Sequence, residues 1–395
     1  MKIFQINTVC GYGSTGRIVV NLANHIEDRG GDCEIAYGRF TKNPNFPHTY
    51  YIGSNLDHYL HGLCSRISDR QGFYSRKATK ALIQEIKRYD PDLIHLHNLH
   101  GYYLNVPILF KFLCDYNKPI IWTLHDCWPF TGHCTYFDMV QCDKWKTQCE
   151  NCIQKTKYPS SYLFDNSEIN FKNKRRLFTA CVKLHIVTPS KWLGEQVSKS
   201  FLSNVDRRVI NNGIDLNKFQ VRKSELKQKL GIEEKKVLLG VASKWGNRKG
   251  YKDFIELSHF IGNDYIVLMV GVNDNQINEL PSNILGIKRT ESIEELCDIY
   301  SLADYYLNLT YEDNFPTTNI EALACGTPVI TYRTGGSVEA INELSGAVVE
   351  KGKIEEIVNI IKNRSFDKEE CRRRALLFDA DDRYEEYYSF YKELI

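Results

Sequence analysis

The chain has no long hydrophobic run. None of its apolar stretches approaches the roughly 20 residues that a membrane-spanning helix requires. Its first residues, MKIFQINTVCGYG, also lack the extended apolar core and small-residue cleavage site of a signal peptide. We therefore expect a cytoplasmic protein without a helical membrane span.

A large net charge is missing as well. Lys and Arg number 51 against 49 Asp and Glu, so the net charge is only +2. That balance gives no electrostatic argument for a nucleic-acid partner, and we expect none. The hydrophobic content of 43% and the charged content of 25% are typical of a soluble globular protein. At 395 residues the chain exceeds what one hydrophobic core usually supports, which predicts two domains.

The cysteines do not have the pattern of a disulfide scaffold. The 13 Cys are odd in number and scattered, which predicts reduced thiols or a metal site. Several gather in the segment 127–158, where Cys149-x2-Cys152 and Cys134-x7-Cys142 form two pairs. Thiolates at these spacings suit tetrahedral Zn²⁺ in a loop-rich insertion without a core of its own. We predict structural zinc on Cys134, Cys142, Cys149 and Cys152, with disulfides or plain reduced cysteines as the alternatives.

Short apolar segments alternate with helical ones along the whole chain. In the first half the segments of strand type are 2–9, 33–37, 93–96, 120–124 and 184–187. In the second half they are 237–242, 266–270, 305–309, 328–332 and 347–349. This alternation predicts an α/β protein with parallel, doubly wound sheets.

The stretch 305–340 carries the most chemistry. Its polar residues fall on loops at the ends of predicted strands, where ligands bind in open α/β sheets. Asp313 lies in the first loop, and Glu321 follows in the helix that the spacing predicts over 317–324. Both acids can therefore accept hydrogen bonds from sugar hydroxyls. The loop Gly335-Gly336-Ser337 offers backbone N–H groups and a helix N-terminus to a phosphate.

Histidines and basic residues also collect at strand ends. Lys244, Arg248 and Lys249 form a basic loop after the predicted strand 237–242, and solvated turn residues are the bland alternative. Histidines at strand ends are more often hydrogen-bonded core residues than catalysts, and three together could instead ligate a metal. The histidines concerned are His95, His97, His100 and His125.

A glycine-rich loop follows the first predicted strand. Gly11-Tyr12-Gly13-Ser14-Thr15-Gly16 has the G-x-G-x-x-G pattern, and Glu34 stands about where the dinucleotide fingerprint expects an acid. The motif alone favours an NAD(P)-dependent oxidoreductase, while a simple tight turn is the structural alternative. Arg17, at the start of the next helix, could meet an anion or be solvated.

The stretch 305–340 resembles the donor-site signature of retaining glycosyltransferase family 4, whose enzymes have the GT-B fold. That signature has an E-x7-E pair, the run EA-x-A-C-G-x-P-V and a GG loop. The matching residues here are Asp313, Glu321, the run Glu321–Val329, and Gly335-Gly336 with Glu339. Asp313 departs from the pattern, because the family has Glu there and Asp is shorter by one methylene.

Other segments extend the resemblance over essentially the whole chain. Ser243–Gly250 is similar to the family's G-R-x-x-x-x-K-G, with Lys249 at the lysine and Lys244 where arginine is usual. His125-Asp126 resembles the family's histidine that faces the donor sugar. In that role the imidazole donates a hydrogen bond to a sugar hydroxyl, while Asp126 orients the ring or contacts the acceptor. The turn 211–219 resembles the one that closes the family's first domain. The Cys-rich segment and the run WPFTGHC resemble a subgroup of capsule and colanic-acid-type glycosyltransferases.

The resemblance implies a GT-B architecture with two Rossmann-like, doubly wound domains that face each other across a cleft. Residues 1–210, with the Cys-rich insertion 127–158, form the acceptor-side domain in this prediction. Residues 211–370 form the domain that binds the nucleotide sugar. Residues 371–395 form a helix that crosses back to the first domain. The charged, aromatic-rich composition of 367–395 predicts one long helix, and Tyr384, Tyr387, Tyr388 and Tyr391 give it a packing face.

The resemblance also implies roles for individual residues. The expected catalytic residues are Lys249, Glu321, His125 and Asp313. The expected donor-binding residues are Lys244, Arg248, Asn314, Phe315, Pro316, Thr317, Gly335, Gly336 and Glu339. The loop on the side of the acceptor and the sugar contributes Gly11, Gly13, Gly16, Arg17 and Asp126.

The implied reaction is retaining transfer of a sugar from a nucleoside-diphosphate (NDP) sugar to a saccharide or lipid-linked oligosaccharide in surface polysaccharide biosynthesis. No cofactor or metal ion is expected for catalysis. The basic run in 168–184, flanked by Phe171 and Phe178, is either a solvated helix face or a patch for anionic lipid. Peripheral contact with the inner face of the cell membrane is therefore a further expectation. The rivals are the oxidoreductase, a GT-B epimerase of UDP-sugars and a non-enzymatic zinc-binding interaction protein.

Overall fold

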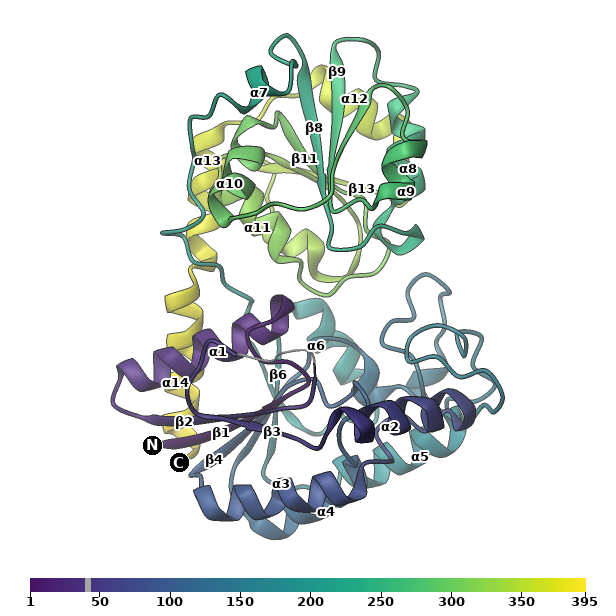
Figure 1. The fold of residues 1–395 in the computed structure, drawn as a ribbon, viewed down its shortest axis with the longest axis vertical. Coiled ribbons are helices and arrows are strands. Elements are labelled where there is room, and N and C mark those ends of the chain that lie inside the picture. The colour runs from purple at the N-terminus through teal and green to yellow at the C-terminus, as the bar shows by residue number, and fades with distance from the viewer. Residues whose placement is uncertain (40–43) are drawn as a thin grey trace. The chain divides into compact units, whose positions relative to one another are not determined.

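The computed structural model describes residues 1–39 and 44–395, which form two compact units (Figure 1). The first unit contains Met1–Ile210 together with Tyr384–Ile395, and the second contains Asn211–Arg383. Each unit is built on one parallel sheet flanked by helices, as the alternation of apolar segments predicts.

The first sheet has seven strands in the order β3-β2-β1-β4-β5-β6-β7, and every pairing is parallel. Its central strands are nearly continuous buried runs because both faces of the sheet are covered. The edge strand β7 is exposed along its length and the edge strand β3 is half-buried, so no apolar run marks either strand in the sequence. The strand bounds are β1 Lys2–Asn7, β2 Asp32–Tyr37, β3 Thr49–Tyr51, β4 Leu93–Leu96, β5 Ile120–Thr123, β6 Leu184–Thr188 and β7 Asp206–Val209.

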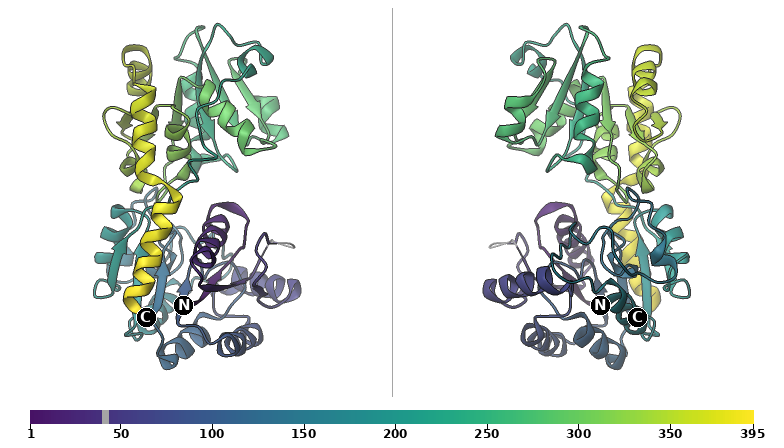
Figure 2. Two further views of the ribbon diagram at one scale, coloured as in Figure 1. Left: turned by 90° about the vertical axis from the view of Figure 1, so that its left-hand side faces the viewer. Right: turned by 90° about the vertical axis from the view of Figure 1, so that its right-hand side faces the viewer.

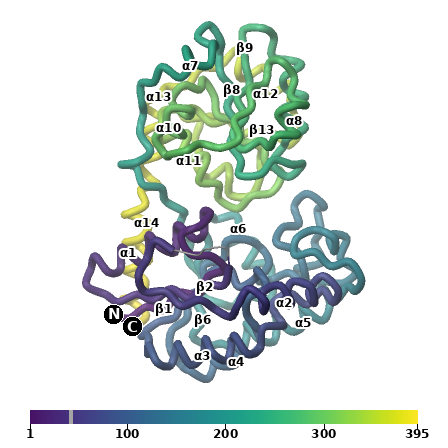
Figure 3. The backbone as a smooth tube through the Cα atoms, viewed as in Figure 1, coloured from purple at the N-terminus to yellow at the C-terminus, as the bar shows by residue number. Residues whose placement is uncertain are grey.

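Helices connect these strands, and several start at a side chain that caps them. Ser54 accepts a hydrogen bond from the third residue of α2, and Asn105 and Ser190 do the same for α4 and α6. Figure 3 follows the chain through these connections and places both termini close together in the first unit. The bounds are α1 Gly13–Asp28, α2 Asn55–Ser68, α3 Arg76–Tyr89, α4 Val106–Tyr116, α5 Ser167–Phe178 and α6 Lys191–Ser198.

The second sheet has six parallel strands in the order β10-β9-β8-β11-β12-β13. Its strands are β8 Lys236–Val241, β9 Tyr265–Val270, β10 Ile284–Ile287, β11 Tyr305–Asn308, β12 Val329–Tyr332 and β13 Gly346–Val349. Its helices are α7 Leu226–Lys229, α8 Tyr251–Ser258, α9 Asp274–Glu279, α10 Ile293–Leu302, α11 Thr317–Ala324, α12 Ile354–Asn363 and α13 Lys368–Ala375.

The C-terminal segment is broken, although its composition predicts one long helix. After α13 a short 3₁₀ turn, Leu376–Phe378, precedes α14 at Ala380–Leu394. From Tyr384 onward α14 belongs to the first unit, along which it runs in Figure 2. The side chains that the sequence assigns to its packing face are all buried, namely Tyr384, Tyr387, Tyr388 and Tyr391.

The chain reverses direction once within each sheet. It moves outward from β1 to β3 and resumes at β4 in the first sheet, and it moves from β8 to β10 and resumes at β11 in the second. Ligands of doubly wound proteins bind at such switch points, beyond the carboxyl ends of the strands. The predicted site residues follow β1, β4 and β5 in the first unit, and β8, β11 and β12 in the second.

Two further features qualify the compositional expectations. No helix in the described residues combines the length and hydropathy needed to cross a membrane. Cys114 at the end of α4 forms a disulfide with Cys181, whereas the sequence predicts reduced thiols or a metal site. Among the described residues, the other 11 cysteines form no disulfide. The two partners are 67 residues apart in the chain, so their spacing gives no sequence signal.

Candidate active site

The loop after β8 is fixed at both ends by packing. Trp245 is buried and its indole Nε1 donates to the carbonyl oxygen of Val270 at 2.9 Å. Gly250 has a φ of +71°, and a Cβ atom there would lie 2.2 Å from the carbonyl oxygen of Leu309. Only glycine allows this approach, which brings the loop against the end of β11.

The basic side chains of this loop meet the loop after β11. Nζ of Lys249 lies 2.7 Å from Oδ2 of Asp313, and both side chains are largely buried. Arg248 donates through Nη1 to the carbonyl oxygen of Glu312 at 2.8 Å. Lys244 is exposed on the same loop. The ion pair therefore spans the switch point between β8 and β11.

Asp313 is held in its charged form by this arrangement. Burial alone would raise the pKa of its carboxyl group, but Lys249 and Arg248 outweigh burial and keep the pKa below its usual value. The backbone N–H of Asn314 also donates to Oδ1 at 2.9 Å. The sequence predicts both members of the pair as site residues but not their direct contact.

Glu321 lies in α11 and is almost fully buried, at 8% exposure. The hydroxyl of Tyr300, from α10, donates to its Oε2 at 3.0 Å. Tyr300 thus orients the carboxylate, and no motif of the sequence points to it. Between Asp313 and α11, the side chains of Asn314, Phe315 and Pro316 are buried, and Thr317 opens the helix.

The Gly335-Gly336 loop begins a 3₁₀ helix, Gly335–Ala340, where the sequence predicts a helix N-terminus. Gly335 has a φ of +49°. Asn319 of α11 donates to both the backbone oxygen and Oγ of Ser337 at 3.0 Å, which ties the loop to α11. The backbone oxygen of Glu339 accepts from Arg374, so this part of the turn is held from α13.

The predicted residues of the second unit thus share one edge of one sheet. Lys249 follows β8, Asp313 follows β11 and Gly336 follows β12, while Glu321 lies in the helix between the last two strands. Cations, acids and backbone N–H groups at the carboxyl ends of parallel strands can together bind a phosphorylated sugar.

The first unit has a chain of hydrogen bonds behind His125. Gln5 donates through Nε2 to the backbone oxygen of Val19 at 3.0 Å, so its Oε1 accepts from His97 Nε2 at 3.0 Å. Neutral His97 then has only an acceptor at Nδ1, which lies 3.1 Å from Nε2 of His125. His125 Nε2 therefore donates to His97, and its unprotonated Nδ1 is a hydrogen-bond acceptor.

The protonation states agree with this chain. Burial lowers the pKa of His125 to about 4 and the pKa of His97 well below its usual value, so both rings are neutral at pH 7. The sequence-based hypothesis gave His125 a donor role toward a sugar hydroxyl. The hydrogen-bond chain makes its Nδ1 an acceptor instead, and a hydroxyl can serve as the donor.

The remaining histidines are held by other partners. His95 contacts Tyr391 and Thr123 at 2.7 and 2.8 Å, which is the role of a satisfied core histidine. His100 Nε2 lies 2.7 Å from Oδ2 of Asp126. Asp126 therefore orients His100, whereas the sequence allowed it to orient His125.

The glycine-rich loop forms a strand-to-helix corner. Gly11 and Gly13 have positive φ values of 70° and 65°, and the backbone N–H of Gly11 donates to the oxygen of Gly16 at 3.0 Å. Arg17 is exposed near the start of α1. This backbone geometry fits a loop that contacts the acceptor and a simple tight turn equally well.

Glu34 does not support a dinucleotide site. It is buried, pairs with Arg88 at 3.3 Å and neighbours Glu85. Burial, together with Glu85, raises the pKa of Glu34 to about 7. A carboxyl group held in this way is not presented to a ribose hydroxyl.

The basic run in α5 is not the surface patch that its sequence allows. Phe171, Phe178 and Lys174 are buried, because they lie on the helix face that packs on the unit. Nζ of Lys174 donates to the backbone oxygens of Trp128 and Thr131 at 2.7 and 3.0 Å. Burial lowers the pKa of this Lys to about 7. Only Lys172, Arg175 and Arg176 of the run are exposed.

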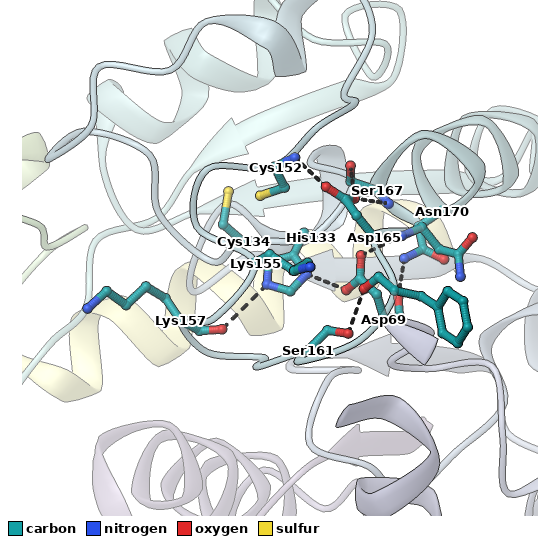
Figure 4. Close-up of polar contacts among 12 residues, drawn as sticks. Asp69, His133, Cys134, Cys152, Lys155, Lys157, Ser161, Asp165, Ser167 and Asn170 are labelled. Atoms are coloured by element: carbon teal, nitrogen blue, oxygen red, sulfur yellow. Dashed lines mark hydrogen bonds and ion pairs between the residues drawn. The ribbon is translucent and has the colours of Figure 1, made fainter. Parts of the chain in front are cut away.

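The predicted zinc ligands lie around one small cavity. Cys134, Cys142, Cys149 and Cys152 all line this cavity of about 20 Å³. Figure 4 shows the sulfur atoms of Cys134 and Cys152 beside each other, next to the buried ion pair of His133 and Asp69. Within the described part of the chain, however, no three His, Cys, Asp or Glu side chains are arranged to hold a metal ion. The donor types fit zinc and their arrangement does not, so the zinc stays a prediction.

Solved structures with the same fold define the class of this protein. Sucrose-phosphate synthase from Thermosynechococcus elongatus has a TM-score of 0.72 at 16% identity, covering 100% of this chain and 98% of its own. Anabaena Alr3699/HepE in complex with UDP-glucose has a TM-score of 0.67 at 16% identity and full coverage of both chains. Two Rossmann-like units with a helical C-terminus make this the GT-B fold of glycosyltransferases. The chain belongs to Glycosyltransferase Family 4, whose model matches residues 15–218, and the model of glycosyl transferases group 1 matches residues 222–375.

Two relatives complete the comparison. WcaC of Escherichia coli (strain K12), named for glycosyl transfer in colanic acid biosynthesis, is 23% identical over 423 residues and covers 100% of both chains. An enzyme of Campylobacter jejuni is 31% identical over 147 residues, which are 33% of this chain and 37% of that protein. It is named N,N'-diacetylbacillosaminyl-diphospho-undecaprenol alpha-1,3-N-acetylgalactosaminyltransferase.

Proposed function

We propose that this glycosyltransferase moves a sugar from an NDP-sugar to a saccharide acceptor with retention at the anomeric carbon. The observation that carries the proposal is the ion pair of Lys249 and Asp313 at the switch point of the second sheet. It puts a cation for a phosphate and an acid for sugar hydroxyls side by side where ligands of this fold class bind.

The second unit supplies the charge stabilisation that the reaction needs. As the bond from the sugar to the diphosphate breaks, negative charge grows on the leaving group. Lys249 and either Lys244 or Arg248 neutralise that charge, and the N–H groups of Gly335-Gly336 donate to the phosphate oxygens. In this scheme the chain's own cations take the place of a divalent ion.

The other site residues orient the donor. Glu321, held by Tyr300, accepts hydrogen bonds from the ribose hydroxyls. Asp313 and the backbone N–H groups of residues 314–317 bind the transferred sugar. His125 accepts a hydrogen bond from a sugar hydroxyl through Nδ1.

The names of the relatives support the nature of the acceptor. WcaC is named for colanic acid biosynthesis, and the Campylobacter enzyme carries a diphospho-undecaprenol compound in its name. We propose a lipid-linked saccharide acceptor and a role in surface polysaccharide biosynthesis, in the capsule and colanic-acid-type subgroup. The chain would act in the cytoplasm at the inner face of the membrane.

Mass spectrometry of NDP-sugar hydrolysis tests this function before the acceptor is known. The chain is incubated in EDTA with a panel of UDP-, GDP- and dTDP-sugars, and we expect slow release of the diphosphate from one of them. NMR of the released sugar should show that the first anomer to form has the configuration of the sugar in the NDP-sugar donor. Release that depends on added metal, or no release from any donor together with a thermal shift by NAD(P)H, would contradict the proposal.

Lys249→Ala provides the residue-level control of that assay. It should lower hydrolysis at least about 100-fold, because the growing negative charge loses its nearest cation. Lys252→Ala, three residues away on an exposed position of α8, should leave the rate unchanged.

A further inference from the structure

Helix α2 of the first unit buries a polar face and exposes an apolar face to solvent. Its inward residues His58, His61 and Ser65 are polar and between 2% and 6% exposed. Its outward side chains are large and apolar and are exposed by 42% to 68%. They are Leu56, Tyr59, Leu60, Leu63 and Ile67, at the spacing of one helix face.

Hydrogen bonds keep this helix in its orientation. Nε2 of His58 donates to the backbone oxygen of Ile52 at 2.8 Å, since a carbonyl can only accept. Nδ1 of His61 lies 2.7 Å from Oγ of Ser75. The polar face is therefore anchored, and the apolar face cannot turn inward without breaking these bonds.

A second apolar segment extends the same surface. The backbone N–H of Tyr162 donates to the oxygen of Arg66 at 2.7 Å, and that of Phe164 donates to the oxygen of Ile67 at 3.0 Å. Tyr162, Leu163 and Phe164 are each at least 60% exposed. In Figure 1, α2, α5 and the loop-rich segment before α5 lie on one side of the first unit. We call the exposed residues of α2 and 162–164 the apolar face.

The surroundings of the apolar face are cationic. Residues 153–178 contain six Lys or Arg and two Asp or Glu. Without the buried Lys174, five Lys or Arg remain, which gives a net charge of +3 in a chain whose total is +2. Arg66 lies on α2 itself, and Nζ of Lys155 donates to the backbone oxygen of Leu163 at 3.4 Å. Positive charge beside exposed aromatic and aliphatic side chains is complementary to an anionic bilayer rather than to another apolar protein surface.

A cationic cavity adjoins the end of α2. It has a volume of about 520 Å³, and Arg70, Arg76 and Lys111 are among the residues that line it. Nε of Arg70 is buried and has no hydrogen-bond partner among the described residues. A headgroup phosphate that entered this cavity would find three positive charges.

We propose that the apolar face inserts into the interface of an anionic lipid bilayer, with Arg66, Lys155 and the Arg70 cavity contacting the headgroup phosphates. Aromatic side chains that carry a polar tip, such as Tyr59 and Tyr162, suit the boundary between headgroups and acyl chains. This inference rests on the proposed function and adds a partner to it, because a lipid-linked acceptor is reached from a membrane surface. The test of membrane binding does not depend on turnover.

Vesicle sedimentation tests the proposal with the full chain. The wild-type protein should bind vesicles that contain phosphatidylglycerol and should bind pure phosphatidylcholine at least about tenfold more weakly. The triple variant Tyr59→Ser, Leu63→Ser, Phe164→Ser should lose at least about tenfold of the binding to the anionic vesicles.

The matched control removes exposed apolar side chains elsewhere. The variant Phe260→Ser, Leu344→Ser, Val182→Ser changes residues that are 48%, 58% and 96% exposed, and it should bind like the wild type. Arg66→Gln with Lys155→Gln should reduce the preference for anionic vesicles but leave weak binding to phosphatidylcholine.

Three results would overturn the proposal. They are no binding by the wild type, equal binding by the triple variant, or equal binding to both lipids. Self-association that the triple variant abolishes, without vesicle binding, would identify a second copy of the chain as the occupant instead. NDP-sugar hydrolysis in solution should be unchanged in the triple variant, so a failure of the proposed function is read separately.

Discussion

At the scale of single residues, the contact of Lys249 with Asp313 is the most informative feature. The lysine and the acid come from loops 64 residues apart, and their charges meet at 2.7 Å. Without a bound sugar nucleotide, the ion pair holds both side chains in place. When a sugar nucleotide binds, Lys249 can contact its diphosphate and Asp313 can turn to the sugar hydroxyls.

His125 gives a prediction that NMR can check. The chain from Gln5 through His97 requires the neutral His125 ring to carry its proton on Nε2. We expect ¹⁵N spectra of the labelled protein at pH 7 to show an unprotonated Nδ1 and a protonated Nε2 for this residue. The opposite tautomer, or a doubly protonated ring, would contradict the inferred acceptor role.

At the scale of elements, the turn between β8 and α8 depends on one glycine. Gly250→Ala combines a positive φ with a clash against the backbone of Leu309, so we expect the free energy of unfolding to fall by at least about 2 kcal/mol. Donor hydrolysis should fall with it because the Lys249 loop shifts. Gly246→Ala is the control, since Gly246 has an extended φ of 178° and no atom within 4 Å of the added Cβ. Chemical denaturation measures both, and equal effects would refute the argument.

The Cys-rich insertion gives the second prediction at this scale. If Zn²⁺ binds Cys134, Cys142, Cys149 and Cys152, the purified chain should contain about one zinc per molecule. Cys149→Ser should lower that content and destabilise the insertion, while Cys64→Ser, outside the insertion, should change neither. A metal-free protein with normal stability in the presence of a chelator would exclude the zinc and leave reduced thiols as the alternative.

Elements with a strong apolar pattern could be predicted from the sequence, and weakly patterned ones could not. The bounds 93–96 and 317–324 agree with β4 and α11, because buried runs and helical spacing mark both. The exposed strand β7 has no such mark. The break at Leu376–Phe378 escaped prediction because its residues are apolar and continue the helical composition of the tail.

The predictability of the site follows the same rule. Motifs identify residues that lie in loops at strand ends, such as Lys249, Asp313 and Gly336. They say nothing of partners on other elements, such as Tyr300 beside Glu321 or Gln5 behind His97. Lys174 shows a different kind of error. The basic run predicts a solvent-exposed helix face, but α5 buries Lys174.

At the scale of the whole molecule, buried histidines make stability depend on pH. Burial lowers the pKa of His95 to about 3 and that of His125 to about 4 from the ordinary value of 6.5. The unfolded chain therefore binds more protons between pH 6.5 and 4, so the free energy of unfolding should fall as the pH drops through this window. Each imidazole contributes at most about 1.4 kcal/mol per pH unit.

Denaturation at pH 7, 6 and 5 measures this dependence. His95→Asn should flatten the slope, because it removes one proton-binding group of the unfolded chain. His259→Asn changes an exposed residue and should leave the slope unchanged. An equal slope for His95→Asn and the wild type would show that this ring is charged in the folded protein.

The central claim is that the second unit holds the diphosphate of a sugar nucleotide through Lys249. Isothermal titration calorimetry of UDP, GDP and dTDP in EDTA tests it most directly. We predict that at least one of them binds the wild-type chain and Lys252→Ala with equal affinity, and binds Lys249→Ala at least about tenfold more weakly. Equal affinity for Lys249→Ala and the wild type, or no binding of any nucleoside diphosphate, would contradict the account.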